Sequence, residues 1–487
     1  MKLTVPVLAV GGASLATLVV VAGGKSGTAT TTPPTSWLGL LSATGYRPGG
    51  PWLTGAVGAA GLILLVLLWV YAMNVVAHGA VSERAAWRLA LAWATPFIVG
   101  PPLVSKDIYA YAANGVMLQN GLDPYRSGVS ALNGLHTAAA ARALAAVDPT
   151  WQRTPSPYGP LSSVIERTAA QIAGGNPVVT VVVLRVVAVL GVGALVWLSA
   201  SLATRNRALV VVGIGLNPLV LVHAVSGGHI EAVMAALLVA GLVAARSRRW
   251  ILAVVLVCAA GAVKAPVYAA LLPMLVVHAR QRTTSRWRPI LLDLLVAALS
   301  TAVFVLLVPN GLGWLHNLST PTKGTSPRSI PVGIYSALHQ VLPAAWSDAV
   351  TTLVTLAALA AAAGVVVWLA VTSERRPLEA SVGLGLVALA ALAPVFYPWY
   401  LLWGLGCLLP VATPQVRDWL VALCAVITLT ALNGLPSWLA LIIDIIAAVV
   451  GAWWLYHRHV VRAGVAAGDA QSRCPDRERT GTAQPIE

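Results

Sequence analysis

Residues 178–202 read VVTVVVLRVVAVLGVGALVWLSASL and contain a single charged side chain, Arg185. A run of this length and apolarity can cross the hydrocarbon core of a bilayer as one helix. The chain holds about fourteen such stretches, two of them short. They begin near Val5, Gly55, Ala85, Val178, Ala208, Ile230, Ile251, Pro266, Ile290, Val350, Ala380, Pro398, Trp419 and Trp438. Because backbone groups in hydrocarbon must be satisfied within their own segment, and the alternating pattern of a barrel does not occur, the sequence predicts an all-α polytopic membrane protein with about 13–14 membrane helices.

Composition excludes an ordinary soluble protein. Of the 487 residues, 58% are hydrophobic and 10% are charged, and the mean hydropathy is +0.81. Roughly two-thirds of the Lys and Arg residues fall in alternate short connections and the tail, as the positive-inside rule requires. We therefore expect these connections to be cytoplasmic, and we expect no nucleic-acid partner despite the net charge of +15. They carry Arg84, Arg88, Arg205, Arg207, Arg246, Arg248, Arg249, the arginines at 280–288, Arg375, Arg376, Arg417 and the arginines from Arg458 onward.

The other connections are larger and are predicted to be extracytoplasmic. The long ones are residues 24–52, 105–176 and 309–348, and the short turns are 226–229, 397–400 and 433–437. Residues 1–462 are predicted to form a single membrane domain, with a disordered cytoplasmic tail at 463–487. Whether residues 1–23 form an uncleaved first span or a signal peptide stays open, and the span is favoured. The absence of a Walker motif and of a dinucleotide fingerprint counts against ATP-driven transport and nucleotide-sugar chemistry.

Few acidic residues fall on the predicted outer side. Asp107 follows the helix-breaking pair Pro101 and Pro102, which sets its carboxylate at the membrane interface. A carboxylate there can take a proton from a sugar hydroxyl. The alternative is that Asp107 only caps the helix that follows, with Ser105 as a rival cap.

Cationic candidates for a phosphate site are also few. Residues 251–264 and 266–279 are flanked on both sides by arginine clusters, so they must enter from the cytoplasm and return to it, with Lys264 at the outer tip. Lys323 and Arg328 lie in the second long connection, and Arg185 lies inside a span. The alternative for Lys264 is snorkelling to the surface, and for Arg185 it is pairing with an acid or with backbone carbonyls.

Six short blocks follow one another on the predicted outer face. They are SKDIYAY at 105–111, GLDPY at 121–125, PYGP at 157–160, GGHIEA at 227–232, VKAP at 263–266 and YPWY at 397–400. In this order, from about Pro101 to about Leu402, they resemble the polyprenol-phosphate-mannose-dependent α-1,6-mannosyltransferases that build lipomannan and lipoarabinomannan cores. The chain departs from that family at Ile230, where asparagine is usual.

The resemblance implies a C-type integral-membrane glycosyltransferase fold, with Asp107 as the catalytic acid residue of the first large outer loop. It implies transfer of mannose from polyprenyl-phosphate-mannose to an α-1,6-mannan acceptor of a cell-envelope lipoglycan, with inversion, on the extracytoplasmic face of the plasma membrane. No cofactor and no metal are expected. The expected substrate contacts are Tyr109, Asp123, Tyr125, Tyr158, Arg185, His229, Glu231, Lys264, Lys323, Arg328, Trp399 and Tyr400, with Trp314 as a further aromatic candidate.

Two alternatives remain at this point. A lipid or sugar transporter or flippase would also have many apolar helices with intramembrane charges, but the long outer connections and the absence of an inverted repeat count against it. A non-catalytic assembly scaffold has no positive support. Asp123 and Tyr125, within a turn sequence, are assigned equally to substrate contact and to anchoring their loop.

Overall fold

The structure, a computed structural model, describes residues 4–25, 50–281, 287–323 and 329–429, together with residues 446, 449–452 and 455. Within these ranges the chain is helical and contains no strand, which confirms an all-α polytopic membrane protein. The predicted tail at 463–487 and the turn at 433–437 lie outside the described residues, as do most of the apolar stretch near Trp438 and most of the connection 24–52.

The elements of the amino-terminal half are α1 (Thr4–Lys25), α2 (Gly50–Ala77), α3 (Glu83–Val99), α4 (Asp107–Gln119), η2 (Val129–Leu135), α5 (Ala138–Ala146), α6 (Pro149–Gln152), α7 (Pro160–Ile172), α8 (Pro177–Leu202), α9 (Arg207–Gly215), η3 (Val220–Ser226) and α10 (Glu231–Arg246). Those of the carboxy-terminal half are α11 (Trp250–Val263), η4 (Ala265–Ala270), α12 (Leu271–Arg280), α13 (Trp287–Leu306), η5 (Gly313–Lys323), α14 (Ile330–His339), η6 (Ala344–Trp346), α15 (Ser347–Val371), η7 (Ser373–Arg375), α16 (Leu378–Leu392), η8 (Pro398–Leu401), α17 (Leu402–Leu408), η9 (Leu409–Val411) and α18 (Pro414–Leu429).

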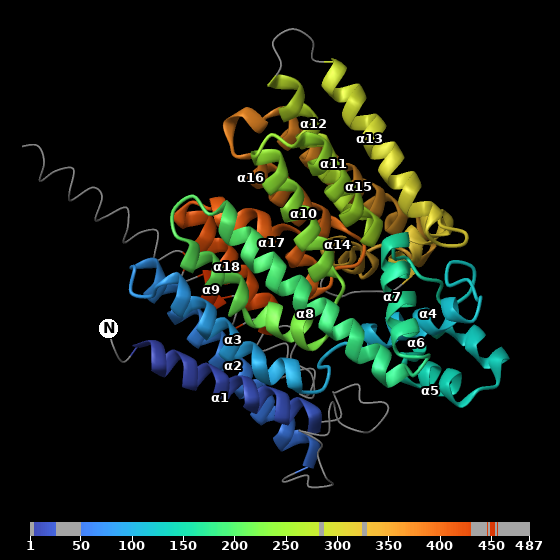
Figure 1. The fold of residues 1–487 in the computed structure, drawn as a ribbon, viewed down its shortest axis with the longest axis horizontal. Helices are drawn as coiled ribbons and strands as arrows, with labels where there is room; N and C mark the ends of the chain where they lie inside the picture. Colours follow the sequence, from blue (N-terminus) through green and yellow to red (C-terminus); the bar gives the residue numbers. More distant parts are fainter. Residues whose placement is uncertain are drawn as a thin grey trace, which may run out of the picture.

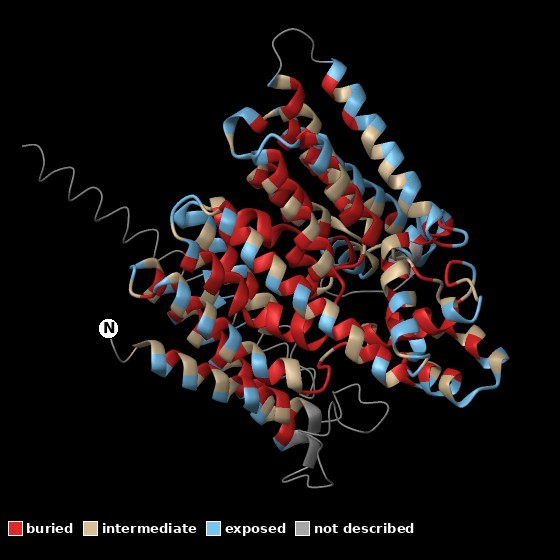
Figure 2. Cartoon of the chain, in the orientation of Figure 1, coloured by how far each residue is buried: buried red, intermediate tan, exposed pale blue. Residues whose placement is uncertain are grey.

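The centre of the molecule is formed by α9, η3, α10 and α17, in which most residues are buried (Figure 2). Helix α10 packs between α8 and α11 and also contacts α17. Helices α1, α2 and α3 pack together on one side, where α3 contacts α9 (Figure 1). Helices that are apolar all round are expected to be buried in this way, because they have no polar face to present to water.

Within the described residues the predicted apolar stretches coincide with helices, but these helices differ in length. Five of the described helices, α1, α2, α8, α13 and α15, are individually long and apolar enough to cross a membrane. The pair α9 and η3 passes the same test together but is bent by 68°. The bend lies at Asn217 and Pro218, where proline removes a backbone donor. The expected 13–14 membrane helices therefore include several that are too short to cross alone.

Two of the long helices expose apolar side chains over most of their length. In the most apolar window of α13 only 11% of the residues are buried, and in that of α15 only 22%. Leucines on these helices, such as Leu291, Leu295 and Leu353, are more than half exposed. An exposed apolar surface of this kind is expected of helices that face lipid.

The arginine-bearing connections contact one another through ion pairs. Arg207 pairs with Glu83 at 3.4 Å, and Arg280 pairs with Glu374 at 3.2 Å. Arg246 donates to the carbonyl of Leu202 at 2.8 Å. Connections that were assigned to one side of the membrane from charge alone are thus neighbours in the fold.

The stretch 105–176 is a group of short helices, α4 to α7, rather than an extended loop (Figure 1). Helix α4 packs against α7 and α8. Gly115 makes this packing close, because a Cβ there would overlap the backbone oxygen of Glu166 on α7. The group is therefore a compact unit that holds the start of α4 in a fixed position.

We predict that Gly115→Ala lowers the thermal stability of the purified protein, since overpacking of this kind costs about 1–3 kcal/mol. The matched control is Gly193→Ala in α8, where a Cβ would meet nothing within 4 Å. That change should be neutral or stabilising by roughly 0.5–1 kcal/mol, because alanine favours a helix over glycine. Melting curves in detergent measure both, and equal melting temperatures for the two variants would contradict the close packing.

Candidate active site

Asp107 is held at the start of α4 by contacts on both sides. The hydroxyl of Ser226 on η3 accepts a hydrogen bond from the Leu103 N–H at 3.2 Å and donates one to the Pro101 carbonyl at 3.2 Å. The hydroxyl of Ser105 accepts from the Asp107 N–H at 3.1 Å. Ser105, the rival cap, thus accepts a hydrogen bond from a backbone N–H in the first turn of α4. The Asp107 carboxylate points elsewhere.

The carboxylate of Asp107 faces the turn between η3 and α10. Its Oδ2 is 3.7 Å from Nδ1 of His229, and the same nitrogen is 3.7 Å from Oε2 of Glu231. Gly228 makes this approach possible, because its φ is +64° and a Cβ there would overlap the side chain of Ile108. The turn therefore packs directly against the first residues of α4.

Lys264 lies at the break between α11 and η4, where the sequence predicted the tip of a hairpin. Its ammonium forms an ion pair with Oε1 of Glu231. It also lies over three aromatic rings, at 5.0 Å from the Tyr158 centroid, 4.4 Å from Tyr400 and 5.6 Å from Trp403. Because its side chain is only 12% exposed, Lys264 does not snorkel to the surface.

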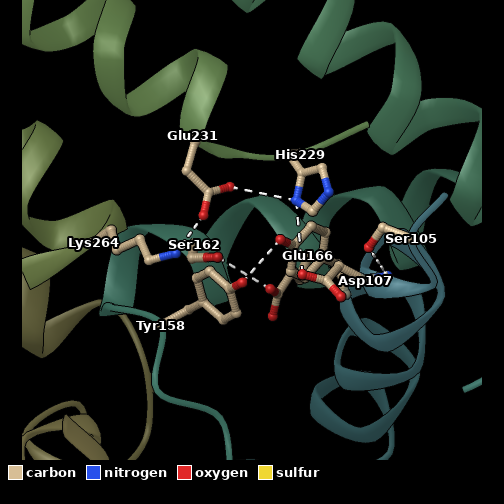
Figure 3. A network of polar contacts seen from close by, with 9 residues as sticks. Ser105, Asp107, Tyr158, Ser162, Glu166, His229, Glu231 and Lys264 are labelled. Atoms are coloured by element: carbon tan, nitrogen blue, oxygen red, sulfur yellow. Dashed lines mark hydrogen bonds and ion pairs between the residues drawn. The ribbon is translucent and has the colours of Figure 1, made fainter. Parts of the chain in front are cut away.

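Asp107, His229, Glu231 and Lys264 thus form a continuous row of charged and polar groups, which we call the polar row (Figure 3). The side chains of His229 and Glu231 are completely buried, whereas that of Asp107 is 22% exposed. The two ends of the row, Asp107 and Lys264, are therefore partly exposed, and its middle is not.

Aromatic side chains from the turn at 397–400 cover the row. Trp399 stacks on His229 with centroids 3.9 Å apart, and Tyr397 stacks on Trp399 at 4.7 Å. Tyr400 stacks on Trp403 at 4.3 Å. The 397–400 turn therefore contacts both the histidine and the lysine of the row.

Burial changes the proton affinities in the row. Burial, and secondarily the charge of Glu231, raise the pKa of Asp107 to about 6. Burial, reinforced by the charge of Lys264, lowers the pKa of His229 well below its usual range. At neutral pH Asp107 is therefore mostly ionised and His229 is neutral, which is the state a general base and an uncharged neighbour require.

Asp123 and Tyr125 lie apart from the polar row and join the two long connections. Asp123 accepts hydrogen bonds from the Tyr125 N–H at 2.8 Å and from Asn310 at 2.9 Å. Asn317 donates to the carbonyls of Tyr125 and Ser156 at 3.0 and 3.1 Å. Tyr125 packs against Trp314 in a small buried cluster. These contacts favour the anchoring role for Asp123 and Tyr125, and Trp314 is buried against protein rather than open to a sugar.

Arg185 and Tyr109 belong to a second buried group. Arg185 donates to the backbone carbonyl of Phe97 at the end of α3 and lies within electrostatic range of Tyr109. Pairing of Arg185 with a backbone carbonyl was one of the two alternatives to a role in phosphate binding. The side chain of Lys323, the last residue of η5, and the whole of Arg328 lie outside the described part of the chain.

Sequence reasoning missed several residues that touch the row or lie beside it. Tyr111 donates to the hydroxyl of Tyr158 at 3.0 Å, and Trp403 lies beside Lys264. Helical spacing could have found both, since Tyr111 is four residues after Asp107 and Trp403 three after Tyr400. Glu166 on α7, which the sequence did place among the few acidic residues of the outer side, is buried and accepts from Ser162 at 3.0 Å. Within the described ranges no group of three or more His, Cys, Asp or Glu is placed to hold a metal ion.

Comparison with known proteins shows the family of the chain. Residues 9–280 match a family model described as "Alpha-(1->6)-mannopyranosyltransferase, N-terminal domain". The chain is 29% identical over 435 residues to alpha-(1->6)-mannopyranosyltransferase A of Mycobacterium tuberculosis, covering 84% of this chain and 81% of the relative. It is 29% identical to alpha-(1->6)-mannopyranosyltransferase B of Corynebacterium glutamicum, covering 74% of this chain and 66% of that protein. No solved structure matches.

The family model spans more than half of the chain, and the relatives are glycosyltransferases by name. The transporter and scaffold alternatives are therefore set aside, and the chain is an integral-membrane enzyme of the transferase class. It belongs to the alpha-(1->6)-mannopyranosyltransferase family.

Proposed function

We propose that the protein transfers mannose from polyprenyl-phosphate-mannose to an α-1,6-mannan acceptor of a cell-envelope lipoglycan, at the extracytoplasmic face of the plasma membrane. The single observation that supports this most is the polar row itself. Its residues come from 105–111, 227–232 and 263–266, and its aromatic cover comes from 397–400. All four segments belong to connections that charge distribution assigns to the outer side.

Asp107 is the general base in this proposal. The acceptor hydroxyl gives its proton to the Asp107 carboxylate while its oxygen forms a bond to the anomeric carbon of mannose. The bond from that carbon to the phosphate oxygen breaks on the opposite face, and the electron pair leaves with the polyprenyl phosphate. Displacement from the opposite face inverts the anomeric centre. Because a lipid phosphate is a stable leaving group, the reaction as proposed needs no cofactor.

Lys264 stabilises the departing phosphate in this proposal. The ammonium of Lys264 has three N–H donors. Its ion pair with Glu231 involves a single carboxylate oxygen, Oε1. The Tyr158, Tyr400 and Trp403 rings around the ammonium exclude water, which strengthens an interaction with an anion. Glu231 holds Lys264 in place and balances its charge in the absence of donor.

Cysteine labelling tests the orientation. Asn133 and Ser247 are both exposed, the first in the 105–176 connection and the second between α10 and α11. In a background that lacks Cys474, Asn133→Cys should react with an impermeant thiol reagent in intact cells. Ser247→Cys should react only after the membrane is opened, because its connection carries three arginines. The reverse pattern would overturn the proposed side of the membrane.

Asp107→Asn tests the proposed base. The amide keeps the size of the carboxylate but not its basicity, so the protein should fold while mannose transfer falls about 10²- to 10⁴-fold. The measurement is transfer of labelled mannose from polyprenyl-phosphate-mannose to a short α-1,6-mannoside, with a nucleotide sugar as the donor control. Asp123→Asn, which alters only an anchoring contact, should be milder. Near wild-type transfer by well-folded Asp107→Asn would reject Asp107 as the base.

The pair of Lys264 and Glu231 gives a test that combines stability with kinetics. Lys264→Met and Glu231→Gln each leave one buried charge without its partner, which typically costs about 3–5 kcal/mol. The double variant should be more stable than the sum of the two losses predicts, because neither charge remains. In kinetics, Lys264→Met should raise the KM for the lipid donor more than that for the acceptor. An unchanged donor KM would mean that the phosphate is bound elsewhere.

A further inference from the structure

His229 has an unusual position for a buried histidine. A single ring nitrogen, Nδ1, faces both carboxylates of the polar row at 3.7 Å. Neither ring nitrogen has a hydrogen-bond partner among the described residues, although the side chain is fully buried. A histidine that served packing alone would normally satisfy these nitrogens. The arrangement therefore indicates a role toward the carboxylates.

The orientation of the ring is fixed by its neighbours. Trp399 stacks on one face at 25° between planes, and Tyr397 lies parallel behind Trp399 with an angle of 1°. On the backbone side, Gly228 packs against Ile108, the residue after Asp107. The same contacts that hold the ring thus hold it relative to the first turn of α4.

We propose that His229 is a positioning residue that carries its proton on Nδ1 and donates it as a hydrogen bond to Asp107, which keeps that carboxylate ionised and aimed at the acceptor. This rests on the proposed function of Asp107 as the base. The tautomer follows from charge, because an unprotonated Nδ1 would direct a lone pair at two carboxylates. The separation of 3.7 Å is longer than a hydrogen bond, and such contacts commonly shorten when substrate binds.

The direction of the pH effect follows from the charged form of Asp107. A donor to the carboxylate stabilises the ionised base and lowers its pKa. Removal of the donor therefore raises that pKa, and the acid limb of the rate profile moves to higher pH. Other groups act on the same carboxylate: Glu231 and Asp148 raise its pKa, and Lys264 lowers it. The phenols that face it belong to Tyr111, Tyr158, Tyr397 and Tyr400.

Two variants separate positioning from packing. The amide of asparagine can place its N–H near the position of Nδ1, whereas the longer glutamine places it near that of Nε2. In the wild type, kcat/KM for the acceptor should fall below a midpoint near pH 6, the pKa of Asp107. His229→Asn should keep that midpoint, and His229→Gln should raise it by about 1 pH unit, a typical effect of one hydrogen bond on a carboxylate. His223→Gln is the matched control, since His223 is also buried beside Trp399, at 5.3 Å, and should leave the midpoint unchanged.

A second measurement does not depend on activity. Apolar carbodiimides react with protonated carboxyl groups, so the extent of Asp107 labelling against pH, read by mass spectrometry, reports its proton affinity directly. The labelling midpoint should rise in His229→Gln and not in His229→Asn or His223→Gln. Equal midpoints in all four proteins would overturn the proposal, as would a loss of folding in both His229 variants, because packing alone would then explain the residue.

The two proposals can fail separately. If Asp107→Asn is inactive but the midpoints do not move, Asp107 remains the base and His229 does not position it. If Asp107→Asn keeps its activity, the general-base mechanism fails, whatever His229 does.

Discussion

The ion pair between Glu231 and Lys264 is the constraint on which the rest of the site depends. A carboxylate with no exposed surface cannot stay ionised without a partner, because removing an ion from water costs several kcal/mol even after the protein relaxes. Lys264 supplies that partner from the break between α11 and η4. The break must therefore lie at the depth of the amino terminus of α10. This accounts for the short length of α11, since a helix that continued across the membrane would carry Lys264 past Glu231.

Two glycines near this ion pair, Gly159 and Gly228, pack so closely against neighbouring segments that a larger residue would displace them. Gly159 donates its N–H to the carbonyl of Val263 at 3.0 Å, and a Cβ on Gly159 would overlap the backbone of Ala262. This contact ties the start of α7 to the residue before Lys264. Gly228 lets the turn before α10 pack closely against the side chain of Ile108 on α4. Four segments far apart in sequence are thus packed around one buried pair through two glycines, where a Cβ would overlap a neighbour.

Much of the site could be predicted from the sequence, because its residues sit at interruptions of apolar runs. Asp107, His229, Glu231 and Lys264 each follow or precede a break that the hydropathy and the prolines or glycines reveal, and the structure brings all four together. Their roles in catalysis and binding remain predictions. The number of full crossings could not be predicted in this way, because an apolar run of 14 residues, such as α11, has the same composition whether it spans or stops within the bilayer.

Two aromatic residues that were predicted to contact substrate, Tyr109 and Tyr125, lie away from the polar row. Tyr109 was grouped with Asp107 because the two are adjacent in one motif, but residues two apart on a helix point in nearly opposite directions. Tyr109 accordingly lies near Arg185, while Tyr111, one full turn from Asp107, contacts Tyr158. Tyr125 belongs to the separate GLDPY turn, for which substrate contact and anchoring were both open, and its hydroxyl is hydrogen-bonded to Ser163 at 2.9 Å. In a chain of broken helices, the spacing between two residues along a helix predicts whether they share a face better than their presence in one motif does.

The charge of the polar row sets a condition on any phosphate donor. With His229 neutral, the two carboxylates outweigh the ammonium of Lys264 by one negative charge. A donor that brings a further negative charge therefore needs additional positive charge nearby, unless Asp107 is protonated at that moment. Lys323 and Arg328 lie in the connection that Asn317 joins to the first one at Tyr125 and Ser156. We therefore predict that this charge comes from the second connection, in which Lys323 and Arg328 are the basic residues that the sequence offers.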